Sequence, residues 1–151
     1  MKHMITITYE FVSSIPNKLK ERTLYVSLDY GTVIHKCCCG CGNEVVTPLS
    51  PTDWKLIYDG VSISLYPSIG NWNFDCKSHY WIDRNNIKWA DQWSDRQIAA
   101  GRSYDLWIKN RHYGITENQL PSKEAPNNIK QIYVKSQNSI LYRIKQWLLN
   151  R

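Results

Sequence analysis

The cysteines constrain this chain most, because four of its five lie in one stretch, Cys37-Cys38-Cys39-Gly40-Cys41-Gly42. The remaining cysteine begins a second short motif, Cys76-Lys77-Ser78-His79. Zinc binds four soft or borderline ligands in a tetrahedron, and a glycine-rich turn allows neighbouring thiolates to converge. The two motifs together predict a zinc site, with these ligands: Cys39, Cys41, Cys76, His79 and, in competition with Cys39, Cys37.

Other uses of the cysteines fit the sequence less well. A Cys-x-Cys spacing on an extended chain places Cys37 and Cys39 on one side and Cys38 on the other. Buried cysteines can be inert, but a cluster interleaved with glycine does not suit a core. A redox centre needs only one thiol and a base. The spacing leaves open whether the zinc is structural or catalytic, the latter with a carboxylate base such as Asp75 or Glu44.

The N-terminal residues predict where the protein is found. Residues 1–14 alternate threonine and isoleucine and lack the apolar segment of a signal peptide. No stretch of the sequence is long and apolar enough to predict a membrane span. We therefore expect a cytoplasmic protein without a membrane partner, in which clustered thiols stay reduced and signify metal binding or catalysis.

Alternation of apolar and polar residues predicts a mainly β protein. Residues 5–11 alternate with period two, and the pattern resumes at Leu24 after a polar break. Asp59-Gly60 predicts a tight hairpin turn, because glycine adopts positive φ readily. The predicted strands are 5–11, 24–28, 32–37, 55–58, 61–66, 79–82 and 87–89. The expected fold is a small antiparallel β-meander or barrel of the α+β type, with a zinc site and a C-terminal helix.

The last third of the chain has a different character. Ser94 is a suitable cap for a short helix from Asp95 to about residue 100, with Gly101 ending it. Residues 114–128 contain prolines and asparagines typical of a loop. An apolar stripe from residue 140 predicts a final amphipathic helix capped by Ser139. We expect a β-rich zinc-binding core at 1–93 and a basic extension at 94–151 packed on the same domain.

The charge distribution bears on possible partners. Residues 1–95 carry nine basic and ten acidic side chains, whereas residues 96–151 carry ten basic and three acidic ones. A basic segment suits an acidic protein, nucleic acid or merely a solvated surface. The seven Trp and ten Tyr residues suit a half-buried binding face or a thin core. Nucleic-acid binding stays an alternative, without a recognisable stacking motif to support it.

Few residues in the sequence are candidates for catalysis. A serine nucleophile needs a base within hydrogen-bond reach. Near the cysteines, the candidate nucleophiles are Ser50, Ser68 and Ser78, and the candidate bases are His35 and His79. If His79 binds zinc, His35 is the base that remains. The sequence contains no Gly-x-Ser-x-Gly, His-Glu-x-x-His or P-loop motif that would identify the reaction.

Several short motifs resemble a bacterial domain family of unknown function. They cover roughly residues 31–90: Cys39-Gly40-Cys41-Gly42, Pro48-Leu49-Ser50-Pro51-Thr52-Asp53-Trp54, Pro67-Ser68-Ile69-Gly70-Asn71-Trp72 and Cys76-Lys77-Ser78-His79-Tyr80-Trp81-Ile82. Members of the family are encoded beside ubiquitin-like proteins and their activating and conjugating enzymes, in operons tied to phage defence. Residues 96–151 carry no such resemblance.

The resemblance implies a role in a ubiquitin-like modification pathway. It implies, as partners, a ubiquitin-like protein and its activating and conjugating enzymes, and as activity a serine-type peptidase that trims the precursor or removes the modifier. It assigns no nucleophile to a position of this sequence. From the residues alone, Ser68 or Ser50 would attack, with His35 or His79 as base. The alternative is a non-catalytic zinc-binding adaptor for the modifier, another protein or nucleic acid.

Overall fold

The computed structural model describes residues 5–114. The chain divides into two compact units, one formed by Met1–Gln92 and one that begins at Trp93. Within the described residues the second unit consists mainly of helix α1, Asp95–His112. The first unit contains the strands β1 (Ile5–Thr6), β2 (Thr8–Phe11), β3 (Thr23–Ser27), β4 (Thr32–Lys36), β5 (Glu44–Pro48), β6 (Lys55–Tyr58), β7 (Ile63–Gly70), β8 (His79–Asp83) and β9 (Asn86–Trp89).

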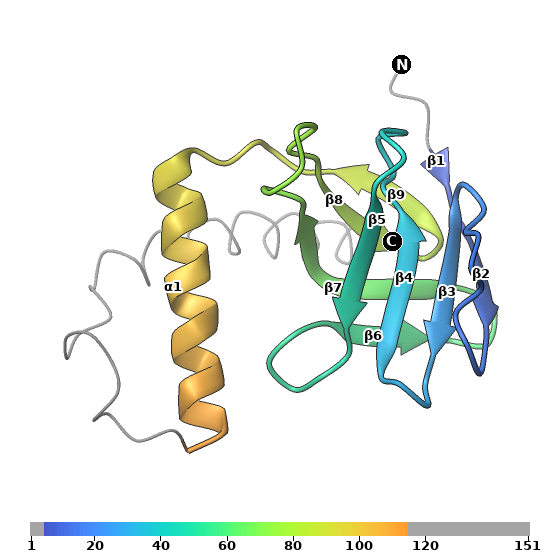
Figure 1. The fold of residues 1–151 in the computed structure, drawn as a ribbon, viewed down its shortest axis with the longest axis horizontal. Helices are drawn as coiled ribbons and strands as arrows, with labels where there is room; N and C mark the ends of the chain where they lie inside the picture. The colour runs from blue at the N-terminus through green and yellow to red at the C-terminus, as the bar shows by residue number, and fades with distance from the viewer. Residues whose placement is uncertain (1–4, 115–151) are drawn as a thin grey trace, which may run out of the picture. The chain divides into compact units, whose positions relative to one another are not determined.

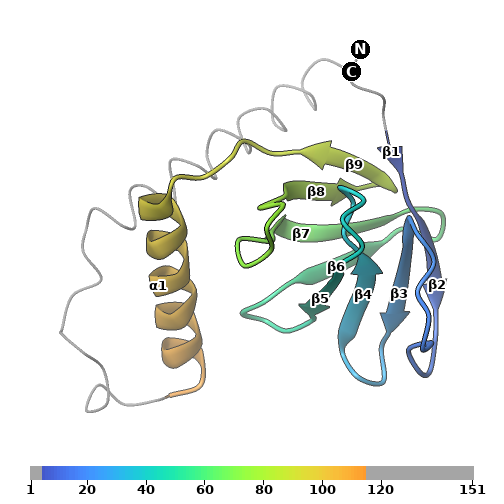
Figure 2. The same ribbon diagram turned by 45° about the horizontal axis from the view of Figure 1, so that its top comes forward.

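The strands form two sheets, which confirms the mainly β prediction. One sheet has the order β1-β9-β8-β7-β6 and the other the order β2-β3-β4-β5. The strands of the two sheets run in clearly different directions (Figures 1 and 2). The described strands form no closed barrel, and the pairing of β2 with β3 is parallel, so the predicted antiparallel meander is wrong at this point.

The parallel pair arises because the first predicted strand, residues 5–11, is divided between the sheets. β1 pairs with β9, whereas β2 pairs with β3. Ile7 lies between them and is buried, and its N–H donates to the carbonyl of Asn85 at 2.8 Å. The next N–H, of Thr8, donates to the carbonyl of Arg22 at 2.9 Å. One residue therefore carries the chain from one sheet to the other.

The core lies between the sheets, where the apolar members of each alternating strand face one another. Both sheets contribute residues exposed by 5% or less, and the burial of such side chains is the main term that favours folding. The principal core side chains are Ile7, Leu24, Val26, Val33, Cys37, Val45, Ile63, Leu65, Ile69, Tyr80, Ile82 and Ile87. The first thiol of the cysteine motif, Cys37, thus belongs to the core.

The predicted hairpin of β6 and β7 forms, and β8 and β9 form a second hairpin with a different turn. β6 and β7 are joined by four residues, in which the Asp59 carboxylate accepts the N–H groups of Val61 and Ser62 at 2.9 and 2.6 Å. This loop is longer than the predicted tight turn. β8 and β9 are joined by Arg84 and Asn85, both with positive φ, as a two-residue primed turn requires.

Helix α1 begins where the sequence predicted. The side chain of Ser94 accepts the N–H of Gln97, whose side chain accepts the Ser94 N–H in return, a capping box. The predicted end at Gly101 is wrong, since the helix continues to His112. A Cβ at Gly101 would lie 2.9 Å from the Trp93 ring, so glycine here makes room for that ring.

Two other predictions concern segments beyond the described part of the chain. The final amphipathic helix from Ser139, and the loop expected after Gly114, both lie outside the described residues. Among the described residues, no helix combines the length and apolar character needed to cross a membrane.

Candidate functional site

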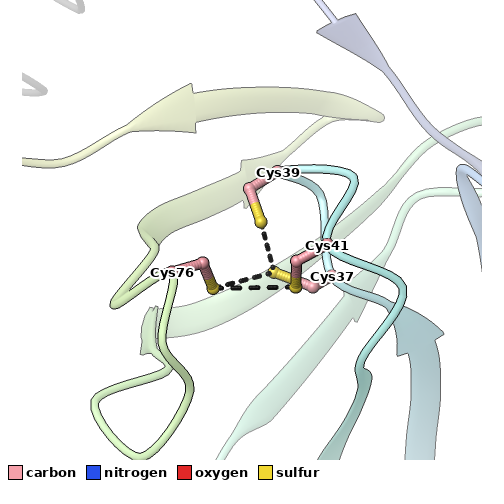
Figure 3. Close-up of side chains that lie close together, drawn as sticks. All are labelled: Cys37, Cys39, Cys41 and Cys76. Carbon is pink, nitrogen blue, oxygen red and sulfur yellow. Dashed lines mark hydrogen bonds between the residues drawn. The ribbon is translucent and has the colours of Figure 1, made fainter.

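Four thiols from two loops of the first unit lie close together (Figure 3). Cys37, Cys39 and Cys41 come from the loop between β4 and β5, and Cys76 comes from the loop before β8. The β4–β5 loop turns tightly, because the N–H of Gly40 donates to the carbonyl of Cys37 at 3.0 Å. Gly40 has a φ of +84°, a left-handed conformation that favours glycine.

The distances between the sulfur atoms fit a tetrahedral metal site. All four lie within 4.8 Å of one another. Cys37 Sγ is 3.3 Å from Cys39 Sγ and 4.0 Å from Cys76 Sγ, which is 3.7 Å from Cys41 Sγ. Four thiolates around zinc, each at about 2.3 Å, have sulfur atoms about 3.8 Å apart. All five cysteines are free thiols, so disulfides do not explain this convergence.

The pKa values of the thiols differ, because some thiols are buried and others accept hydrogen bonds. Burial raises the pKa of Cys37, although its hydrogen bond with Ser78 opposes the shift. The pKa of Cys41 is lowered to about 7, first by the backbone N–H of Asn43 and also by its side-chain amide, which lies 3.3 Å from the sulfur. Thiolates crowded together repel one another, and a divalent cation among them removes that repulsion.

Cys38 and His79, which also belong to the two cysteine motifs, lie outside the group of four thiols. Cys38 is outside the four-thiol group, and burial raises its pKa to about 12. His79 is also outside this group, although the Cys-x-x-His spacing made it a candidate ligand. The fourth position is taken by Cys37. Four protein thiols complete a tetrahedral zinc site and leave no open position, as in structural zinc sites.

His79 instead contacts Ser68 on the neighbouring strand. His79 Nε2 is 2.9 Å from Ser68 Oγ, and His79 Nδ1 is 2.7 Å from the backbone carbonyl oxygen of Asp91. Because a carbonyl can only accept, Nδ1 carries the proton and Nε2 is the acceptor for the serine hydroxyl. A hydroxyl, an imidazole acceptor and a third group that fixes the tautomer form the arrangement of serine hydrolases.

The local structure explains why these groups meet. The N–H of Ala90 donates to the carbonyl of His79 at 2.9 Å, which brings Asp91 beside the imidazole. Gly70 is the register partner of His79 on β7, and a Cβ there would lie 2.4 Å from the Trp72 indole nitrogen. The missing side chain allows the Trp72 ring to lie 4.9 Å from the His79 ring.

Burial lowers the pKa of His79, and the Asp91 carbonyl and carboxylate oppose the shift. The imidazole is therefore neutral at pH 7, the form that can accept a proton. Ser68 is half-buried and so keeps some access to solvent. This pair has the protonation state and the distance that nucleophilic catalysis requires.

Two further catalytic candidates, His35 and Ser50, lie in different surroundings. His35 is fully buried, contacts the Tyr80 hydroxyl at 2.9 Å through Nε2, and has a pKa lowered by burial to about 4. Ser50 Oγ donates to a carboxylate oxygen of Asp53 at 2.7 Å and accepts the N–H groups of Thr52 and Asp53. These are the hydrogen bonds of a turn. Neither residue contacts the other in a nucleophile–base pair.

A buried polar network joins the thiols to the strand that carries His79. Ser78 Oγ lies 3.0 Å from Cys37 Sγ and accepts the side-chain amide of Asn71 at 2.9 Å. The backbone N–H of Asn71 donates to the carbonyl of Ser78 at 2.8 Å. Ser78 directly precedes His79. The contact of Cys37 with Ser78 therefore links the position of the thiols to the start of β8 and to the position of the imidazole.

Three contributors to the site were not predicted from the sequence: the Asp91 carbonyl, the Asn71 side chain and the Trp72 ring. Asp91 acts through its backbone, so its side-chain type gives no signal. Asn71 and Trp72 belong to one of the motifs that carry the family resemblance, but that motif assigns neither residue a role, and their residue types are those of an ordinary turn.

The fold and site together define a small β protein with a serine–histidine pair and a group of four thiols that could hold a metal ion. Comparison with family models matches residues 11–90 to BubE, described as a bacterial ubiquitination-like system serine protease. The match covers more than half of the 151 residues, and the chain belongs to this family. No curated protein and no solved structure matches the chain significantly. The expected membership of a bacterial family linked to ubiquitin-like systems is confirmed.

Proposed function

We propose that this chain is a zinc-containing serine peptidase that trims or removes a ubiquitin-like modifier in a bacterial anti-phage conjugation pathway. One observation carries the proposal: the 2.9 Å contact between Ser68 Oγ and His79 Nε2, with the tautomer set by Asp91. The family description supports the same reaction class. The partners in this account are the ubiquitin-like protein and its activating and conjugating enzymes.

In the proposed mechanism, Ser68 attacks the carbonyl carbon of the scissile amide while His79 Nε2 takes the hydroxyl proton. The C–N bond then breaks, and the leaving amine takes that proton from His79. Water hydrolyses the resulting Ser68 ester, again with His79 as base, and releases the carboxylate. The Nδ1–H bond to Asp91 keeps Nε2 directed at Ser68 throughout. Ser50 and His35 take no part.

The proposed metal is zinc, held by Cys37, Cys39, Cys41 and Cys76. The set of four thiols fits zinc by ligand type and by sulfur spacing. The zinc has a structural role, because it ties the β4–β5 loop to the segment that precedes β8. We place the activity in the region 1–93 and the protein in the cytoplasm, where free clustered thiols persist.

The proposed function is tested with the ubiquitin-like precursor encoded beside this chain. Wild-type protein should release a shortened precursor, detected by intact-mass spectrometry, and Ser68→Ala should release none. Ser50→Ala is the matched control and should retain the activity, since Ser50 only closes a turn. An intact precursor after incubation with wild-type protein, despite binding, would favour the adaptor function instead.

The proposed base predicts the pH dependence of the reaction. The pKa of His79 lies below its ordinary value of 6.5 because of burial, so the neutral base survives to lower pH than a free imidazole would. We expect kcat/KM to be constant above pH 7 and to fall as pH drops through a value below 6.5. An acid limb centred above pH 7 in the kcat/KM profile would contradict this assignment.

A further inference from the structure

The outer face of the five-stranded sheet carries two aromatic rings beside the serine–histidine pair. On β8, Tyr80 and Ile82 are buried in the core, so the alternate residues His79 and Trp81 share the opposite face. Residues two apart on a strand are separated by about 7 Å. Trp81 therefore lies one strand repeat away from the proposed base, on the same face of the sheet, where His79 is buried and Trp81 is half-buried.

Tyr66 joins Trp81 on this face from the neighbouring strand. The two rings lie 5.5 Å apart between centroids, with their planes inclined by 41°. Tyr66 is 37% exposed and Trp81 is half-buried, so the rings present apolar area to solvent. Such exposed aromatic area with a polar edge is typical of recognition surfaces.

The pairing of the two strands is irregular where Ser68 lies. Leu65 pairs with Ile82, whereas Ile69 pairs with Tyr80, so β7 uses four steps where β8 uses two. Irregularities of this kind redirect side chains and occur next to active sites. Here the extra residues include both Tyr66 and Ser68, so one ring of the aromatic pair and the proposed nucleophile lie on the same short segment of β7.

We propose that Tyr66 and Trp81 form the subsite that receives an apolar side chain of an extended substrate peptide, two residues from the scissile bond. This inference rests on the proposed function. An extended peptide advances about 7 Å in two residues, which matches the repeat from His79 to Trp81. A peptide bound at Ser68 thus brings an alternate side chain to the ring pair, where apolar contact selects it.

The subsite is tested by protection against a small alkyl fluorophosphonate. In this labelling, Ser68 Oγ forms a bond to phosphorus, fluoride leaves, and His79 takes the hydroxyl proton before passing it to solvent. The competing ligands are two hexapeptides, each made of five glycines and one other residue, which is Leu in one peptide and Gln in the other. A bound peptide covers Ser68 and slows the labelling. The peptides are neutral because Lys55 and Lys88 are the register partners of Tyr66 and Trp81. The readout is the rate of mass increase at several peptide concentrations.

For wild-type protein, the Leu peptide should protect Ser68 at roughly tenfold lower concentration than the Gln peptide. Trp81→Ala and Tyr66→Ala should bring this ratio close to one, and Trp81→Phe should keep it. Tyr58→Ala, at an exposed aromatic residue of β6, is the control and should also keep it. Because the ratio is taken within each variant, a change in overall reactivity does not affect it.

Two results would overturn the subsite while leaving the proposed function intact. One is labelling of wild-type Ser68 with equal protection by both peptides. The other is a Leu preference that survives in both alanine variants. Failure of the probe to label wild-type Ser68 would overturn the proposed function, and the subsite with it.

Discussion

The variant His79→Gln should cleave the ubiquitin-like precursor about four orders of magnitude more slowly than wild type, measured as kcat. Gln has no titratable nitrogen and cannot take the Ser68 hydroxyl proton, which His79 Nε2 is placed to accept at 2.9 Å. The substrate is not held by this nitrogen, so KM should change much less than kcat. Initial rates of product formation, followed by intact mass, give both constants.

The matched control for this variant is His112→Gln. His112 is exposed in the last turn of α1 and belongs to no proposed catalytic pair. Its replacement should leave both kinetic constants within about twofold of wild type. Equal activity of the His79→Gln variant and wild type would show that another residue is the base.

If the four thiols hold zinc as proposed, the variant Cys76→Ser should lose that zinc and most of the stability of the β unit. Cys76 is the only cluster thiol outside the β4–β5 loop, so its loss detaches that loop from the segment before β8. Structural zinc contributes on the order of 10 kcal/mol to folding in small domains, and a missing ligand forfeits a large part of it. Native mass spectrometry with metal analysis and thermal denaturation should show both losses together.

Cys38→Ala is the control for this experiment. Cys38 lies in the same stretch, yet outside the four-thiol group, so its replacement should keep one zinc per chain. Cys38 packs against the core, and a small loss of melting temperature is expected from the removed sulfur. Retention of zinc by Cys76→Ser, or its loss from Cys38→Ala, would contradict the proposed ligand set.

The sequence predicted those parts of the molecule that depend on local pattern. Alternation along residues 24–28 identified a strand, and Ser94 identified a helix start. The split of residues 5–11 at Ile7 could not be predicted, because both halves alternate identically and only their partners differ. Gly101 was taken for a helix end since its contact with Trp93 is invisible in the sequence.

In the candidate site, too, the sequence predicted what depends on local spacing and missed what depends on long-range strand pairing. The cysteine spacings indicated that thiols of the two motifs converge, but they made Cys37 and Cys39 competitors for one place, whereas both lie in the four-thiol group. The role of His79 depended on long-range pairing: the Cys76-x-x-His79 spacing suits a zinc ligand, yet β8 directs the imidazole to Ser68. His35, two residues before Cys37, is buried as Cys37 is, so the core and not the solvent surrounds this candidate base.

The central claim is that Ser68 is a nucleophile activated by His79. Reaction of the wild-type protein with a small alkyl fluorophosphonate, followed by proteolysis and mass mapping of the adduct, tests it most directly. The account predicts one adduct per chain, on Ser68, and at least a hundredfold slower labelling in His79→Gln, on the order expected when a positioned base is lost. An adduct on Ser50, or no adduct at all on folded, zinc-loaded protein, would contradict it.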